Sequence, residues 1–156
     1  MRIIVFSDSN GETAGLLTAV EEERPDAIFF LGDGARDAED LHYAFPDIPM
    51  YQVPGNCDWM LHDLPHRRLV PLDGVRFFLC HGHTYGVKSG LSTAVSRARS
   101  EGADVLLYGH THVPDFQLFG ELQVFNPGSV RDTRTYGMIL TQRGCASCSI
   151  RHITGT

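Results

Sequence analysis

The sequence lacks any long apolar segment, and this absence argues against a membrane-spanning protein. A transmembrane helix needs about 20 consecutive apolar residues, and no run in this chain approaches that length. Met1 and Arg2 lead directly into the first strand-like segment, with no apolar leader before it. We therefore expect a cytoplasmic protein that does not work at a membrane.

The sequence also lacks an excess of basic residues. It has 13 Lys and Arg against 19 Asp and Glu, which gives a formal net charge of -6. Nucleic-acid binding depends on basic surfaces that release counterions, so this balance argues against nucleic acid as a partner. Part of the acidic charge lies in Glu21, Glu22 and Glu23, which should form a solvated face at the end of a helix.

Cysteine is sparse, and its spacing does not describe a disulfide framework. The four residues are Cys57, Cys80, Cys145 and Cys148, and a cytosolic chain would keep them reduced. The pair at 145 and 148 has no second pair of ligands, so we do not expect a zinc or redox role for it. Histidine, in contrast, is abundant: four of the eight residues occur as HGH at 81–83 and HTH at 110–112.

The length of 156 residues is enough for one domain, 1–156, with a substantial core. Hydrophobic periodicity and turn residues predict helices over about 11–23, 36–44 and 90–101. Strands are predicted at 2–7, 27–31, 49–53, 67–72, 75–80, 104–108, 114–119, 122–126, 136–141 and 145–153. Asp73-Gly74 should form a hairpin turn. This order favours an α/β fold with a mixed sheet, or two packed sheets, and helices outside.

Six predicted strands end in Asp, Asn or His beside a small residue. In an open α/β sheet, ligands bind outside the carboxyl ends of the strands, where these side chains would meet. Turn chemistry explains each Asp, Asn or Gly taken singly, but it does not explain histidine at two of the ends. The residues are Asp8, Asp33, Asn56 with Asp58, His81 with His83, His110 with His112, and Asn126.

The segment FSDSNGET, 6–13, allows two compatible readings. Ser9 and Glu12 fit a helix capping box, while Asp8 fits a metal ligand. Carboxylates, an amide and imidazoles around one point suit Mn, Fe, Zn and related divalent ions. The candidate ligands are too many for one tetrahedral ion, so two ions are implied: Asp8, Asp33, Asn56, His81, His110 and His112.

The ordered motifs SDSNG, LGDG, PGNCD, CHGH, GHTH and NPGS resemble those of the calcineurin-like metallophosphoesterases. Within that superfamily, the chain resembles the small bacterial and archaeal phosphodiesterases over essentially its whole length. The resemblance implies a four-layer α/β/β/α sandwich, with two mixed β-sheets flanked by helices. It also implies a dinuclear metal centre on the strand-end loops.

The resemblance further implies a role for each matched residue. Asp33 would bridge the two ions, with Asp8 and His112 on the first ion. The second ion would be bound by Asn56, His81 and His110. His83 would orient a neighbour, and Asn126 and Ser129 would have a structural role.

The chain departs from the family pattern at Asn10 and Cys57. Histidine is common at position 10, so an Asn oxygen there implies a weaker first site, or one that favours Mn or Mg over Zn. Mn is therefore the expected metal, with Mg, Fe, Ni and Zn as alternatives. Many relatives have histidine in place of Cys57, which leaves the general acid open between water, Asp58 and His83.

The activity implied is hydrolysis of a small phosphate ester, more specifically a diester, and the substrate could be a nucleotide. Two cations roughly 3.5–4 Å apart would hold a hydroxide near Asp33 for in-line attack on phosphorus. Arg67 and Arg68 could clamp the phosphate or form a solvated strand face. Trp59, with Met60 and Leu61, could stack against or enclose a base or an aromatic leaving group, or could cover a sheet edge.

A binding scaffold on the same fold is the alternative, with the retromer subunit of the superfamily as the precedent. Asn10 favours this alternative, whereas the six retained ligands favour catalysis. Repair nucleases share the motifs, but the acidic charge argues against that activity. Phe116, Leu118 and Phe119 could be core or interface, so a homo-oligomer is compatible with the sequence.

Overall fold

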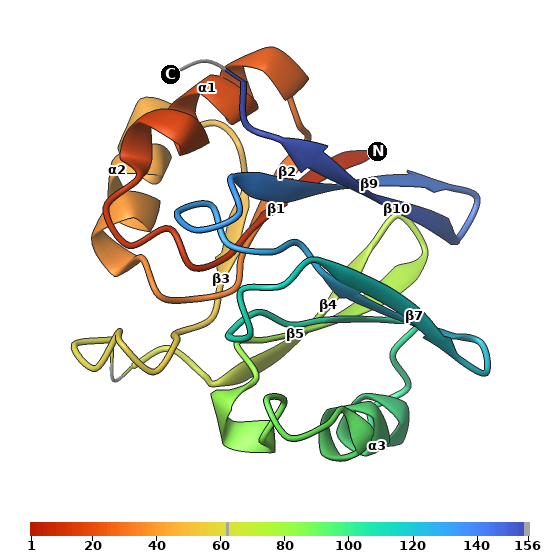
Figure 1. The fold of residues 1–156 in the computed structure, drawn as a ribbon. Coiled ribbons are helices and arrows are strands. Elements are labelled where there is room, and N and C mark those ends of the chain that lie inside the picture. The colour runs from red at the N-terminus through yellow and green to blue at the C-terminus, as the bar shows by residue number, and fades with distance from the viewer. Residues whose placement is uncertain (62, 155–156) are drawn as a thin grey trace.

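Two five-stranded mixed sheets pack face to face in the computed structural model, which describes residues 1–61 and 63–154 (Figure 1). The first sheet has the order β10-β9-β1-β2-β3 and the second has the order β4-β5-β6-β8-β7. The strands of the first sheet are β1 (Arg2–Phe6), β2 (Ala27–Phe30), β3 (Met50–Gln52), β9 (Thr135–Gln142) and β10 (Cys145–His152). Those of the second are β4 (Arg67–Leu72), β5 (Val75–Cys80), β6 (Val105–Leu107), β7 (Asp115–Phe119) and β8 (Leu122–Asn126).

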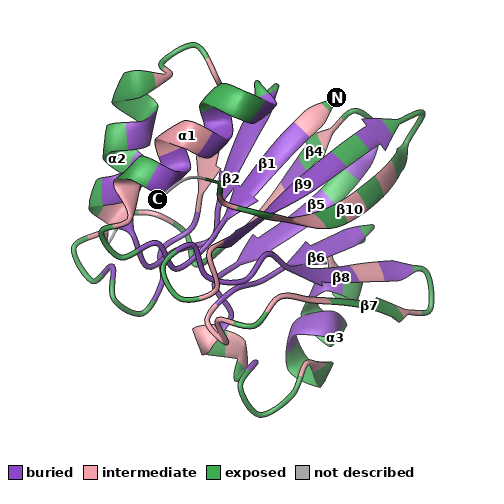
Figure 2. Cartoon of the chain, turned by 45° about the horizontal axis from the view of Figure 1, so that its top comes forward, coloured by how far each residue is buried: buried purple, intermediate pink, exposed green. Residues whose placement is uncertain are grey.

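Helices cover the outer faces of both sheets. The first sheet is covered by α1 (Thr13–Glu23) and α2 (Ala35–Ala44), and the second by α3 (Ser92–Ser100) (Figures 1 and 2). A 3-10 turn, η1 (His83–Tyr85), follows β5. The four-layer α/β/β/α arrangement predicted from the sequence is confirmed.

Alternation of side chains along the strands produces three apolar layers. In β1, Ile3 and Val5 point between the sheets, whereas Ile4 and Phe6 pack against α1 and α2. On the second sheet, Phe78 packs under α3 in the same way. Because successive strand residues face opposite sides, strands buried on both sides read as continuous apolar runs.

The parallel strands determine where the functional loops lie. β1, β2 and β3 are mutually parallel neighbours in the first sheet, and β5, β6 and β8 are parallel neighbours in the second. Their carboxyl ends therefore emerge at one edge of the sandwich. The loops that carry the candidate ligands follow five of these strands.

The predicted hairpin at Asp73-Gly74 is confirmed, since Leu72 pairs with Val75 across these two residues. Their φ angles of 49° and 77° lie in the left-handed region that a type I′ turn requires. The predicted capping box is wrong. The helix begins at Thr13, and no side chain caps it. The Ser9 hydroxyl instead donates to Asp37 of α2 at 2.6 Å.

The prediction of a solvated acidic face fails at its last residue. Glu21 and Glu22 are exposed, but Glu23 is only 8% exposed and pairs with Arg2 and Arg151. Tyr136 of β9 also donates its hydroxyl to Glu23 at 2.8 Å. This carboxylate therefore joins α1 to the first sheet.

β7 forms one edge of the second sheet, and its apolar side chains are only partly covered. Phe116 is 45% exposed and Leu118 is 64% exposed, so neither belongs to the core. Phe119 packs against the cluster under α3. An interface at Phe116 and Leu118 stays a prediction. No helix within residues 1–61 and 63–154 has the length and apolarity to cross a bilayer.

Candidate metal centre

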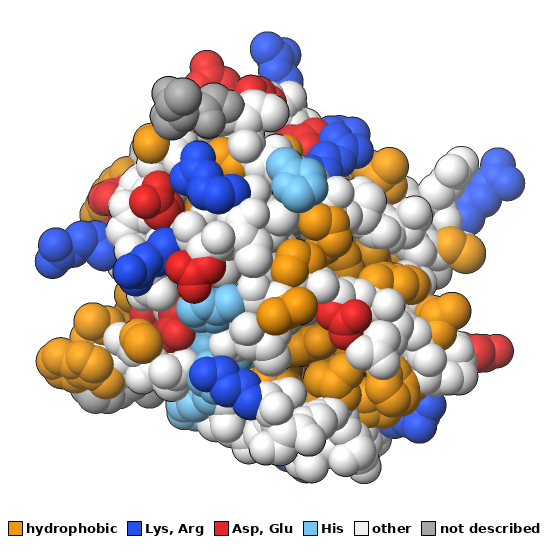
Figure 3. Space-filling model, in the orientation of Figure 1, with side chains coloured by type: hydrophobic (Ala, Val, Ile, Leu, Met, Phe, Trp, Pro, Cys, Tyr) orange, Lys and Arg blue, Asp and Glu red, His pale blue; other side chains and the backbone are white. Residues whose placement is uncertain are grey.

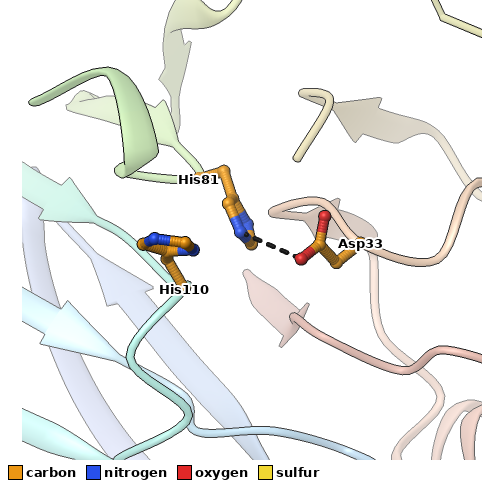
Figure 4. A group of neighbouring side chains, drawn as sticks. All are labelled: Asp33, His81 and His110. Carbon is orange, nitrogen blue, oxygen red and sulfur yellow. Dashed lines mark ion pairs between the residues drawn. The ribbon is translucent and has the colours of Figure 1, made fainter. Parts of the chain in front are cut away.

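The loops after β1, β2, β5 and β6 bring the central candidate ligands together at the edge of the sandwich. Side-chain atoms of Asp33, His81 and His110 lie within 4.8 Å of one another, and Asp33 and His81 are buried (Figure 4). The loops are held in unusual backbone conformations. Within the described part of the chain, nine non-glycine residues have positive φ, and five of these are candidate ligands: Asp8, Asn10, Asp33, His110 and His112. Such conformations cost ~1–3 kcal/mol each and cluster at functional sites.

The orientation of His81 is fixed by a hydrogen bond to the backbone. Its Nδ1 lies 2.8 Å from the carbonyl oxygen of Leu31, which can only accept, so Nδ1 carries the proton. In the neutral ring, the lone pair on Nε2 then faces oxygens of Asn56 at 3.0 Å, Asp33 at 3.3 Å and Asp8 at 3.8 Å. A metal ion satisfies such a group of inward-facing donor atoms.

His112 has the same arrangement on the other side of Asp8. Its Nδ1 is hydrogen-bonded to the carboxylate of Asp132, which leaves Nε2 facing Asp8 Oδ1 at 3.2 Å. Asp8 Oδ2 accepts from the Ser7 hydroxyl at 2.6 Å and from the His110 backbone N–H at 3.1 Å. Asp8 Oδ1 is buried and has no hydrogen-bond partner among the described residues. Buried polar atoms seldom lack a partner, and a cation would provide one.

The charges of these groups influence one another strongly. Burial raises the pKa of Asp8, and the positive charge of His81 only partly offsets it. Burial acts in the same direction on Asp33, but hydrogen bonding to His81 and to Cys57 holds its pKa at about 2. Burial would lower the pKa of His81, yet Asp33 and Asp8 together raise it.

His110 is held neutral. Burial, followed by the positive charges of His81 and Lys88, lowers its pKa to about 4. A neutral imidazole is the form that binds metal. The mixed nitrogen and oxygen donors, the neutral His110 and the unpartnered oxygen of Asp8 therefore fit divalent cations.

Asn10 lies at the rim of this group. It is exposed, and its backbone N–H donates to the Asp33 carbonyl at 3.1 Å. With Cys57 and Met60 it lines a hollow of about 310 Å³. Cys57 donates its backbone N–H to Asp33 Oδ1 at 2.8 Å, while its thiol is exposed and has a pKa raised by partial burial and by Asp33.

Asp58 holds the loops in place. It is 4% exposed, and its two oxygens accept four backbone N–H groups, those of Asp33 (2.7 Å), Gly34 (3.2 Å), Ala35 (3.2 Å) and Gly55 (2.8 Å). These four bonds engage both carboxylate oxygens. This geometry assigns Asp58 a positioning role in place of the proton-donor role suggested by the sequence.

Gly55 is needed beside Asp33. A Cβ at this position would lie 2.1 Å from Asp33 Oδ1 and 2.6 Å from the Asp33 backbone nitrogen. The glycine in the PGNCD segment therefore allows the third loop to approach the carboxylate that lies among the ligands. Any side chain here would displace Asp33.

Arg67 and Arg68 are not brought into the centre. Arg67 pairs with Glu101 at 2.7 Å, and Arg68 lies over the Tyr51 ring and donates to the Gln52 carbonyl at 3.4 Å. The geometry thus favours the surface alternative for both residues over a phosphate clamp. The positive charge of Lys88, in contrast, contributes to the lowered pKa of His110.

His83 lies beside the centre and is not one of the grouped donors. It is half-buried, and its Nδ1 is buried without a hydrogen-bond partner among the described residues. Its ring lies 5.4 Å from the ring of His81 and 5.7 Å from that of His66. Burial and the charge of His81 lower its pKa.

The NPGS segment, 126–129, is hydrogen-bonded to the loops that carry the candidate ligands. Asn126 donates to the Gly109 carbonyl at 3.3 Å, and Ser129 donates its hydroxyl to the Asp8 carbonyl at 2.8 Å. These bonds hold the loops after β1 and β6. They agree with a structural role for both side chains.

Three residues at or near the centre carried no signal in the sequence. Asp132 orients His112, Lys88 acts on His110, and His66 lies against His83. Each belongs to a loop or strand end without a motif around it. Only the folded chain brings them to the ligands.

The motif order and the fold agree with a known family. A model of the calcineurin-like phosphoesterase superfamily domain matches residues 1–143. The chain belongs to this superfamily. The resemblance seen in the motifs is therefore confirmed. Membership of the superfamily supports a hydrolase activity, that of a metal-dependent phosphoesterase.

Calcineurin-like relatives cover nearly the whole chain. "Phosphodiesterase YfcE" of Escherichia coli K12 is 30% identical over 168 aligned positions, covering 89% of this chain and 87% of YfcE. The crystal structure of a predicted phosphoesterase from Streptococcus pneumoniae TIGR4 superposes with a TM-score of 0.77 at 25% identity. It covers 96% of this chain and 97% of that one.

The same fold occurs in Vps29. The structure of wild-type Vps29 from Entamoeba histolytica complexed with Zn²⁺ has a TM-score of 0.75 at 16% identity, and the match covers 99% of this chain and all of that one. At this identity the likeness concerns the fold.

Proposed function

We propose that the protein is a phosphodiesterase that acts on small phosphate esters with two divalent ions. The observation that carries the proposal is the pair of oriented imidazoles. His81 and His112 each donate Nδ1–H to a protein oxygen and turn Nε2 toward carboxylate oxygens of Asp8 and Asp33. Such an arrangement is the usual support for metal-bound histidine.

The chain's own residues divide the two ions between them. Asp33 would bridge the two ions, with Asp8, His112 and the Asn10 oxygen on the first ion. The second ion would be held by Asn56, His81 and His110. When bound, the ions would neutralise the phosphate oxygens and activate water for in-line attack.

Proton transfer to the leaving group falls to water or His83. His83 and His66 line the hollow beside Asn56, and His83 is the one that also lies next to His81, whereas Asp58 is engaged by backbone N–H groups. The lowered pKa of His83 makes the neutral ring the dominant form at neutral pH. It would therefore act by orienting water or the ester oxygen.

We propose Mn²⁺ as the preferred metal. Asn10 would supply a neutral, hard oxygen at the first ion, where an imidazole would favour Zn²⁺.

We also propose a cytoplasmic location. The cysteines at positions 57, 80, 145 and 148 are free thiols, which agrees with a role in the reducing cytoplasm.

Hydrolysis of bis(p-nitrophenyl) phosphate by metal-stripped protein tests the proposal. Added Mn²⁺, Mg²⁺, Zn²⁺ or Ni²⁺ should restore turnover, with Mn²⁺ the most effective. Asp33→Ala should remove turnover at unchanged fold, as followed by circular dichroism. Absence of turnover with every metal in folded wild-type protein would reject the enzyme.

A binding scaffold is the second candidate, and the exposed Asn10 is the observation that favours it. If the first ion binds weakly, a chain could retain the fold and lose turnover. Asn10→His separates the two functions. In an enzyme it should shift metal preference toward Zn²⁺, whereas in a scaffold it should leave turnover absent.

A further inference from the structure

A hollow of about 340 Å³ opens beside the second half of the candidate metal centre. Its lining includes Asn56, Trp59, His66 and His83. Figure 3 shows histidine side chains on the same face as a projecting hydrophobic tip. A ligand whose phosphate lies at Asn56 would extend into this hollow.

The walls of the hollow differ in chemistry. Trp59 is the single tryptophan of the chain and is 75% exposed, although tryptophan is usually well buried. In the same lining, the rings of His66 and His83 meet edge to face with centroids 5.7 Å apart. An exposed indole and polar imidazole rings lining one hollow suit a flat ligand that has both an aromatic face and hydrogen-bonding edges.

The size and charge of the site limit the ligand further. The hollow is at the lower end of the ~300–1,000 Å³ range of small-molecule sites. The net charge of -6 offers no basic path for a polymer. Simple aryl groups would leave the polar atoms of His66 and His83 without partners.

We infer that this hollow is a nucleobase subsite, in which Trp59 stacks on the base and His66 with His83 contacts its polar edge. The inference rests on the proposed phosphodiesterase and specifies its substrate class as esters of nucleoside phosphates. In hydrolysis, the bond between phosphorus and one ester oxygen breaks, water supplies the new oxygen on phosphorus, and the leaving alcohol gains a proton.

Binding of AMP, compared with ribose 5-phosphate, tests the subsite without turnover. The two ligands share the sugar phosphate, and only AMP has a base. With Mg²⁺ or Zn²⁺ present, AMP should quench the Trp59 emission to saturation and should bind about 5- to 100-fold more tightly by calorimetry. Equal affinities, or no quenching at saturating AMP, would overturn the inference.

Two variants assign the effect to the hollow. Trp59→Ala should remove the advantage of AMP, and His66→Ala should reduce it about 2- to 10-fold. Met60→Ala is the matched control, because Met60 is exposed on the same loop but lines the other hollow, with Asn10. An unchanged AMP advantage in Trp59→Ala would overturn the inference.

Failure of the nucleobase subsite can be distinguished from failure of the proposed phosphodiesterase function. Base-dependent binding without hydrolysis of bis(p-nitrophenyl) phosphate would support the subsite and reject the enzyme. Hydrolysis with no preference for AMP over ribose 5-phosphate in binding would support the enzyme and reject the subsite.

Discussion

Single hydrogen bonds determine which atoms of the centre face inward. The Leu31 carbonyl turns Nε2 of His81 toward Asp33, and the Asp132 carboxylate does the same for His112. The sequence predicted the histidines because turn chemistry does not explain histidine at two of the strand ends. It could not predict Asp132, since an exposed aspartate in a loop resembles any other surface acid.

Removal of Asp132 should weaken metal binding without removing a ligand. Asp132→Ala frees the His112 ring to rotate and to change tautomer, so metal affinity should fall about 10- to 100-fold. Calorimetric titration with Mn²⁺ measures it. Asp47→Ala, an exposed aspartate before β3, is the control. Equal affinities in the two variants would contradict the orienting role.

Metal binding should release protons at neutral pH. The carboxylates raise the pKa of His81, so the metal-free ring holds a proton that an ion must displace. Apparent affinity should therefore fall as pH drops through the imidazole range. Calorimetry in buffers of different ionisation enthalpy measures the protons released. A binding enthalpy that does not change with the buffer, together with a metal affinity that does not change with pH, would contradict the displacement of a proton from His81.

At the scale of the elements, buried carboxylates join loops to one another and helices to strands. Asp58 joins the loops after β2 and β3, and Glu23 joins α1 to β1 and β10. Strand and helix positions could be predicted because period and turn residues are local signals. The capping box and the solvated Glu23 were predicted wrongly, because Asp37 and Arg151 lie far along the chain and compete for these side chains.

Asp58→Ala should lower both stability and metal affinity. Four backbone N–H groups would lose their acceptor, which we expect to cost about 2–4 kcal/mol of unfolding free energy. Urea unfolding and Mn²⁺ titration measure the two effects. Asp63→Ala, an exposed aspartate at the end of the same loop region, is the control. Lost turnover at wild-type stability and metal affinity would instead restore Asp58 as a proton donor.

Glu23→Gln should destabilise the fold and leave the centre unchanged. Loss of a buried carboxylate from an ion pair costs ~3–5 kcal/mol, and we expect about 2 kcal/mol because both guanidinium groups are 40% exposed. Thermal unfolding measures the loss, with Glu21→Gln on the solvated face as the control. An unchanged melting temperature would contradict the role of Glu23.

The whole molecule is a support for six loops at one edge of two packed sheets. Its fold class could be predicted because the order of strands, helices and motifs is recorded along the chain. The pairing order of the sheets and the approach of Gly55 to Asp33 could not, since they arise from contacts between distant segments. The same holds for the hollow beside Trp59.

The number of ions required for turnover tests the central claim most directly. Metal-stripped protein should be titrated with Mn²⁺ while bound metal per chain and bis(p-nitrophenyl) phosphate hydrolysis are measured together. We expect turnover to appear as the second equivalent binds, with His112→Ala retaining one ion and losing turnover. Full turnover at one ion per chain, or none at any occupancy, would contradict the two-ion phosphodiesterase.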